Sequence, residues 1–179
     1  MMPPKQVSWL TVGAILSIYR PLPHDVFFDI ESLGHTDQYI RMLEDQLRPL
    51  LAAPAKSEEA MLSMSMQVTV RGFSEQWIFA LYERLRTQRD VDPSKRFVGK
   101  LMLLNPFFDK LARLRMPIAK NEVQGGSNKN KTPDFPIPLF DTSTGSAGWQ
   151  IKDKDGGAPV VLLRREMADE FLQAIVKCK

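Results

Sequence analysis

Three basic side chains surround a proline in the stretch LARLRMPIAKNE, at residues 111–122. Arg115 and Lys120 are separated by four residues, at a point where proline interrupts an apolar, helix-like run. Two cations about one helical turn apart, beside free backbone N–H groups, can hold an anion such as a phosphate. The stretch therefore predicts an anion site, although this spacing also arises often by chance. The predicted binding residues are Arg113, Arg115, Lys120, Asn121 and Glu122.

The segment LRMPIAKNE resembles the LRNxxAHxE stretch of HEPN domains, a superfamily of small helical bundles that often dimerise. In those families the arginine and the histidine lie at the start of a helix and line a cleft between two subunits. Many members are metal-independent ribonucleases of toxin and antiviral systems, whereas others only bind nucleotides, RNA or partners. The resemblance implies that Arg115 steadies a phosphate, and it suggests a bacterial defence or toxin–antitoxin context.

Two positions depart from that pattern. Met116 stands where a polar residue is usual, and Lys120 stands where histidine is expected. Histidine takes a proton near neutral pH because its ordinary pKa is about 6.5, whereas an ordinary lysine stays charged and has no lone pair to offer. We therefore expect a HEPN-like domain, non-catalytic and dimeric, that binds nucleic acid, a nucleotide or a protein partner.

Two other hypotheses stay open. The chain is a metal-independent ribonuclease if Lys120, or His24 or His35 from elsewhere in the fold, supplies the base beside Arg115. Alternatively, it is a structural or regulatory interaction bundle. Other enzyme classes lack their signatures, because the sequence has no phosphate-binding glycine loop, no GxSxG and no HExxH motif.

The basic residues are concentrated in one part of the chain. The net charge is only +3, but acidic residues are few between residues 84 and 120. Such a segment suits the phosphates of a nucleic acid or nucleotide, and it also suits an ordinary solvated helix face. Its basic residues are Arg84, Arg86, Arg89, Lys95, Arg96, Lys100, Lys110, Arg113, Arg115 and Lys120.

Cysteine and histidine usage argues against disulfides and metal sites. Cys178 is the only cysteine, so no intrachain disulfide forms, which fits the reducing cytoplasm. His24 and His35 lack the short spacing of a metal pair, and we expect neither a metal nor another cofactor.

The apolar run SWLTVGAILSIY is shorter than the roughly 20 residues of a membrane span. It predicts a buried first helix, with a signal-peptide core as the alternative.

The periodicity predicts one domain over residues 1–179 that is mainly α, a helical bundle with a β-hairpin near the C-terminus. Thr36 or Asp37 is the predicted N-cap of a helix closed by Pro54. A helix is predicted to begin near Pro93 or Ser94, with a second one starting at Asn105 and a boundary at Pro117. The last helix is REMADEFLQAIVKCK, with one apolar face.

The strongest helical pattern runs from Ser57 to Arg89. Its apolar stripe begins at Met61, Met64 and Val68, and it slips near Gly72, where we expect a kink or a close helix crossing. Methionines at this spacing are typical of core packing, and an adaptable binding surface is the alternative. The other apolar residues of the stripe are Phe73, Trp77, Ile78, Leu81, Tyr82 and Leu85.

Residues 123–148 are rich in Gly, Ser, Asn, Thr and Pro and predict a long loop, of the kind that is functional or disordered. Its FPIPLF segment either covers the bundle or forms, with Trp149, a contact surface for a partner. Strand-like runs on both sides of KDGG predict a β-hairpin over residues 149–163.

Overall fold

The computed structural model describes residues 9, 12, 15–16, 24–52, 57–90, 94, 96–120, 135–153 and 157–178, without the side chains of residues 24–29, 57, 116, 119 and 120. It confirms a mainly α fold with a small antiparallel sheet near the C-terminus. The helices are α2 (His24–Ala52), α3 (Ser57–Arg89), the 3₁₀ helix η1 (Gly99–Leu104), α4 (Asn105–Lys120) and α5 (Arg164–Lys177). The strands are β1 (Ile137–Phe140), β2 (Ala147–Ile151) and β3 (Val160–Leu163).

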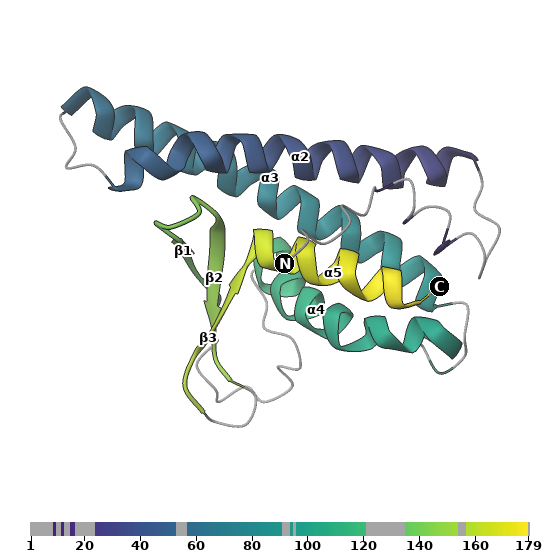
Figure 1. The fold of residues 1–179 in the computed structure, drawn as a ribbon. Coiled ribbons are helices and arrows are strands. Elements are labelled where there is room, and N and C mark those ends of the chain that lie inside the picture. Colours follow the sequence, from purple (N-terminus) through teal and green to yellow (C-terminus); the bar gives the residue numbers. More distant parts are fainter. Residues whose placement is uncertain are drawn as a thin grey trace, which may run out of the picture.

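The two long helices α2 and α3 lie side by side and antiparallel, and they span the whole length of the molecule (Figure 1). Ile40 and Leu47 of α2 and Val70 of α3 are fully buried. Tyr39 and Phe73 meet edge to face, with their ring centroids 5.4 Å apart. One end of this helix pair extends past α4 and α5, which lie below its other half in the view.

Helices α4 and α5 close the core beneath α3. Phe107 of α4 packs on Phe171 of α5, with ring centroids 5.3 Å apart, and Phe108 stacks on Tyr82 of α3 at 4.8 Å. The predicted inward face of α4 is confirmed, because Phe107, Phe108, Leu111 and Leu114 are all buried. Trp9, Val12, Ile15 and Leu16 are helical and buried too, as expected for the first helix.

The sheet has the order β1–β2–β3, with both neighbouring pairs antiparallel. The predicted hairpin is confirmed in β2 and β3, where Trp149 pairs with Leu162 and both side chains are buried. The long loop predicted over residues 123–148 is wrong in its second half. Residues 137–140 form edge strand β1, which tolerates Pro138 because an edge position need not donate a hydrogen bond.

Helix α2 passes through the predicted cap without interruption, so the N-cap at Thr36 or Asp37 is wrong. The Thr36 hydroxyl donates to the Ser32 carbonyl within the same helix, at 2.9 Å. Gly34 is a close-approach position, because a Cβ there would lie 2.4 Å from the Trp9 Cβ. The sequence therefore uses glycine to admit Trp9, not to break the helix.

The boundary predicted at Pro117 is also wrong, because α4 continues to Lys120 with Pro117 inside it. Because proline has no N–H, Pro117 removes one intrahelical hydrogen bond, the one to the carbonyl of Arg113. The predicted start at Asn105 is confirmed. The α-helix expected from Pro93 or Ser94 is instead the short 3₁₀ helix η1, whose first residue, Gly99, has a φ of +57°. Helix α3 has the predicted bounds and runs unbroken through Gly72.

Candidate functional site

The structure places the motif arginines in the last turns of α4, whereas the HEPN resemblance implies the start of a helix. Arg115 Nη2 lies 2.9 Å from Glu83 Oε1 of α3, and its guanidinium carbon is 5.3 Å from the Tyr82 ring centroid. Arg113 donates from Nη2 to the carbonyl oxygen of Lys152. Both described cations of the motif therefore already have partners within the chain.

The remaining predicted site residues lie outside the description. These are the side chain of Lys120 and residues Asn121 and Glu122. The side chain of His24 lies outside it too, whereas His35 is exposed on α2, with Nε2 3.9 Å from Glu31 Oε1. The anion site and the ribonuclease hypothesis thus stay predictions.

Several cations of the basic segment form ion pairs. Arg86 contacts both Glu83, at 2.8 Å, and Asp90, at 3.3 Å, along the exposed side of α3. Lys110 of α4 contacts Glu170 of α5 at 2.7 Å. Exposed pairs of this kind contribute roughly 0–1 kcal/mol each, so a strong anion can still displace them. The pattern matches the solvated helix face considered from the sequence more closely than a built phosphate pocket.

A buried ion network joins the start of α5 to α2. The Arg164 side chain is fully buried, with Nη2 2.8 Å from Glu44 Oε2, and its Nη1 donates to Asp37 Oδ1. Arg165 Nε also reaches Glu44 Oε2, at 2.7 Å. The members are Asp37, Arg41, Glu44, Asp45, Arg164, Arg165 and Asp169.

The two buried acids of this network are each bound by arginines. Glu44 accepts hydrogen bonds from Arg164 and Arg165, and Asp37 accepts them from Arg164 and Arg41. Since each buried carboxylate has two arginine partners, both charges are compensated. The sequence does contain a signal for this network. Two arginines, Arg164 and Arg165, directly follow an apolar strand, and two acids on α2, Asp37 and Glu44, are seven residues apart. The sequence analysis missed the network because these partners are more than 100 residues apart in the chain.

The expected core stripe of α3 is exposed at its N-terminal end. Met61, Met64 and Val68, here called the methionine face, are 76%, 69% and 70% exposed. The prediction that they pack in the core is therefore wrong. The buried face passes instead through Val70, Ser74 and Trp77, because about 100° of rotation per residue places Val68 far around the helix from Val70. The slip near Gly72 marks this change of face.

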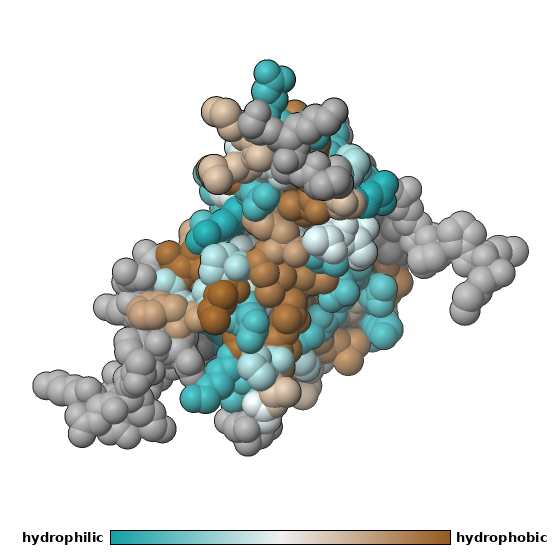
Figure 2. Space-filling view, turned by 90° about the vertical axis from the view of Figure 1, so that its left-hand side faces the viewer, coloured by the Kyte–Doolittle hydropathy of each residue, from teal (hydrophilic) through white to brown (hydrophobic). Residues whose placement is uncertain are grey.

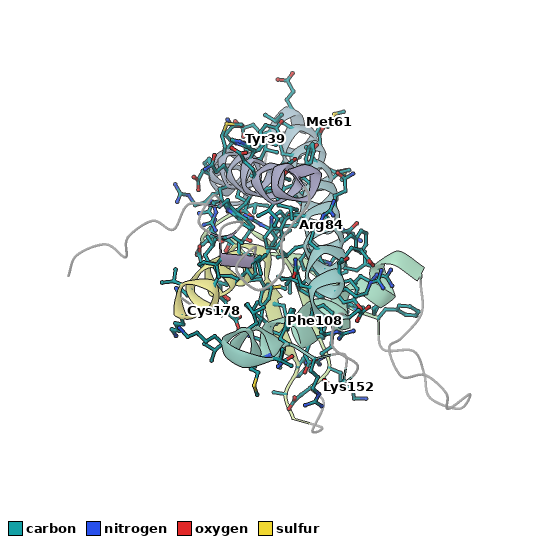
Figure 3. The ribbon with its side chains drawn as sticks, turned by 90° about the vertical axis from the view of Figure 1, so that its right-hand side faces the viewer. Tyr39, Met61, Arg84, Phe108, Lys152 and Cys178 are labelled. Carbon is teal, nitrogen blue, oxygen red and sulfur yellow. The ribbon has the colours of Figure 1, made fainter. Side chains whose placement is uncertain are left out.

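The methionine face belongs to the part of the helix pair that extends past α4 and α5. Figure 3 shows Met61 and Tyr39 at the top of the molecule, away from Phe108, Lys152 and Cys178 below. Leu62 of α3 and Met42 of α2 are also exposed apolar residues of this part. Large apolar side chains gathered on one protruding element indicate a contact surface.

The outer face of the sheet is a second apolar surface, but it is partly closed by its own residues. Figure 2, which looks onto the side of the molecule where the sheet lies in Figure 1, shows brown residues gathered between teal ones. Ile137 and Val161 are exposed there. Leu139 and Leu163 close over Gly148, since a Cβ at that glycine would lie 3.0 and 2.6 Å from their methyl carbons. The three side chains of the methionine face are each about 70% exposed or more.

Within the described ranges, no group of three or more His, Cys, Asp or Glu side chains is placed to hold a metal ion. Over the same residues, no helix has the length and apolar character needed to span a membrane. Comparison of the sequence with protein-family models gave no match. Comparisons with curated proteins and with solved structures gave none either.

Proposed function

We propose that this chain is a non-catalytic interaction domain that binds a protein partner through the methionine face. The observation that carries the proposal is the exposure of Met61, Met64 and Val68 on one side of α3. Fully burying one such side chain is worth roughly 1.5–3 kcal/mol, so covering all three supplies several kcal/mol toward binding. Methionine is common on surfaces that accept partners because its unbranched chain adapts its shape.

Charge favours a protein partner over a nucleic acid at this surface. The side of α3 that carries Met61, Met64 and Val68 has no lysine in the described residues, and the nearby Arg71 is paired with Glu75 at 2.8 Å. Nucleic-acid binding needs several cations that face the phosphates. The HEPN resemblance, RNA or nucleotide binding at Arg115, the homodimer, the cytoplasmic location and the defence context stay predictions beside this proposal.

A photo-cross-linking residue at position 68 tests the proposal in native-host extract. We expect a discrete protein adduct from position 68 and none from position 102, where Met102 is another exposed methionine, on η1. Met64→Glu should abolish the adduct, because it places a charge at the centre of the surface. The proposal fails if position 68 gives no protein adduct, or if Met64→Glu leaves the adduct unchanged.

A further inference from the structure

We infer that the occupant of the methionine face is an amphipathic α-helix from another protein, lying antiparallel to α3 as α4 does farther along it. This inference rests on the proposed function and adds the chemistry and direction of the partner. It is carried by three features of the described residues. These are the continuity of one face along α3, the direction of α4 on that face, and the charges at the two ends of the exposed N-terminal half of α3.

The first feature is that the exposed half of α3 continues the face that binds α4. Met61, Val68, Glu75 and Tyr82 follow one another at intervals of seven residues. Such residues drift by only about 20° per interval, so the four share one side of the helix. Tyr82 stacks on Phe108 of α4 with ring centroids 4.8 Å apart. The same side of α3 is thus covered by a helix at Tyr82 and exposed at Val68 and Met61.

The second feature is the direction of α4. Phe108, early in α4, lies against Tyr82 and under Arg89, whose guanidinium carbon is 4.3 Å from its ring centroid. Arg115, two turns later, contacts Glu83. Helix α4 therefore runs toward the N-terminal end of α3. A second helix on the methionine face can keep this antiparallel direction and the same kind of side-chain interdigitation, beside the sheet, whose strand β2 also packs on α3.

The third feature is the charge at the two ends of the exposed half. Glu58 and Glu59 are exposed at the start of α3. Arg71, at the far end of the methionine face, is exposed and paired with Glu75 at 2.8 Å, so it binds an acid of the partner by exchanging Glu75 for it. An antiparallel helix brings its first turn near Arg71 and its last turn near the two glutamates. Acidic residues in the first turn and basic residues in the last turn suit both ends, and the helix dipole favours the same arrangement.

Gly72 allows such a helix to approach closely, because no atom lies within 4 Å of the position where its Cβ would be. From Glu58 to Gly72 the surface is roughly 21 Å long at about 1.5 Å per residue, which is about four helical turns. The expected partner segment is therefore an amphipathic helix of about four turns, with apolar residues spaced three and four apart.

Two synthetic peptides test the inference with the full chain. Both are designed four-turn helices with the same apolar stripe; one has glutamates in its first turn and lysines in its last, and the other has these charges exchanged. We expect the glutamate-first peptide to bind at least tenfold tighter in fluorescence anisotropy. Arg71→Glu should remove most of this preference, because both ends of the surface are then acidic and Glu58 and Glu59 still favour lysines. Met64→Glu should weaken binding at least tenfold, while Met102→Glu should change it less than twofold.

Circular dichroism melts of each variant separate lost binding from lost folding. Met64 and Met102 are exposed, so their variants should melt nearly as the native chain does. Arg71→Glu loses its ion pair with Glu75 and should lower Tm slightly. Failure of both peptides to bind, or equal binding to the Met64→Glu variant, overturns the helical partner. Sedimentation that shows a dimer dissociated by Met64→Glu also overturns it, since the occupant is then a second copy of the chain. In each of these cases the cross-linking result at position 68 decides the proposed function independently.

Discussion

Replacing Arg164 by methionine tests whether the buried ion network holds α5 and β3 against α2. The arginine side chain and that of Glu44 are both 0% exposed, and they make two hydrogen bonds, at 3.2 and 2.8 Å. Arg164 also donates to Asp37. Arg164→Met removes these bonds while keeping an unbranched side chain in the core, so the loss comes mainly from two carboxylates that stay buried with fewer partners.

Breaking a buried pair by removing one partner costs about 3–5 kcal/mol. We expect the lower end of this range, because Glu44 keeps Arg165 at 2.7 Å and Asp37 keeps Arg41 at 3.1 Å. A loss of about 3 kcal/mol is large beside the total of roughly 5–15 kcal/mol for a domain. Arg71→Met is the matched control, because its pair with Glu75 is exposed and worth at most about 1 kcal/mol.

Measuring Glu44→Gln both in the native chain and in the Arg164→Met variant then identifies the cause of the lost stability. In the native chain it removes the charge that compensates buried Arg164, so the free energy of unfolding should fall by at least about 2 kcal/mol. In the Arg164→Met background Glu44 has lost one partner and keeps only Arg165, so the same substitution should cost clearly less than in the native chain. Urea unfolding at pH 7, followed by tryptophan fluorescence, measures all four chains. Additive losses from the two substitutions, or a loss below about 1 kcal/mol for Arg164→Met, refute the reasoning.

Three further predictions concern single residues. Burial raises the pKa of the Cys178 thiol, and the nearby charge of Lys100 opposes this with a smaller effect. Iodoacetamide at pH 8 should therefore alkylate the folded chain more slowly than the urea-unfolded chain. Equal rates would contradict this burial. Gly145→Ala places a Cβ 2.1 Å from the Glu44 carbonyl oxygen, at a residue whose φ is +74°. It should lower Tm by at least about 4 °C. Gly72→Ala, in the middle of helix α3, should raise Tm slightly. Hydrogen bonds from Thr144 and Ser143 lower the pKa of Asp141, so its stabilisation is present above the ordinary aspartate pKa of about 3.9 and is lost as pH falls through the lower folded value. Asp141→Asn should therefore destabilise the chain at pH 6 more than at pH 2, as measured by urea unfolding; an equal loss at both values would exclude the charge as the cause.

The sequence by itself determined the helices whose ends are set by local signals. Ser57 and Arg89 bound α3, and α4 starts at Asn105, as predicted. The Asn105 side chain itself bonds to the backbone of Phe97 rather than capping α4. The hairpin of β2 and β3 followed from its turn sequence. Such signals work because a cap or a turn involves residues within a few positions of one another, so nothing distant can change them.

Only the tertiary structure decided which apolar and charged side chains are buried. Asp37 has the sequence context of a helix cap, but Arg164, far along the chain, makes it part of a buried network. Met61, Met64 and Val68 have the spacing of a core stripe, yet α4 covers only the other half of α3 and leaves them exposed. Periodicity states which residues share a side of a helix, whereas the side that is buried depends on how far the neighbouring helices extend along it.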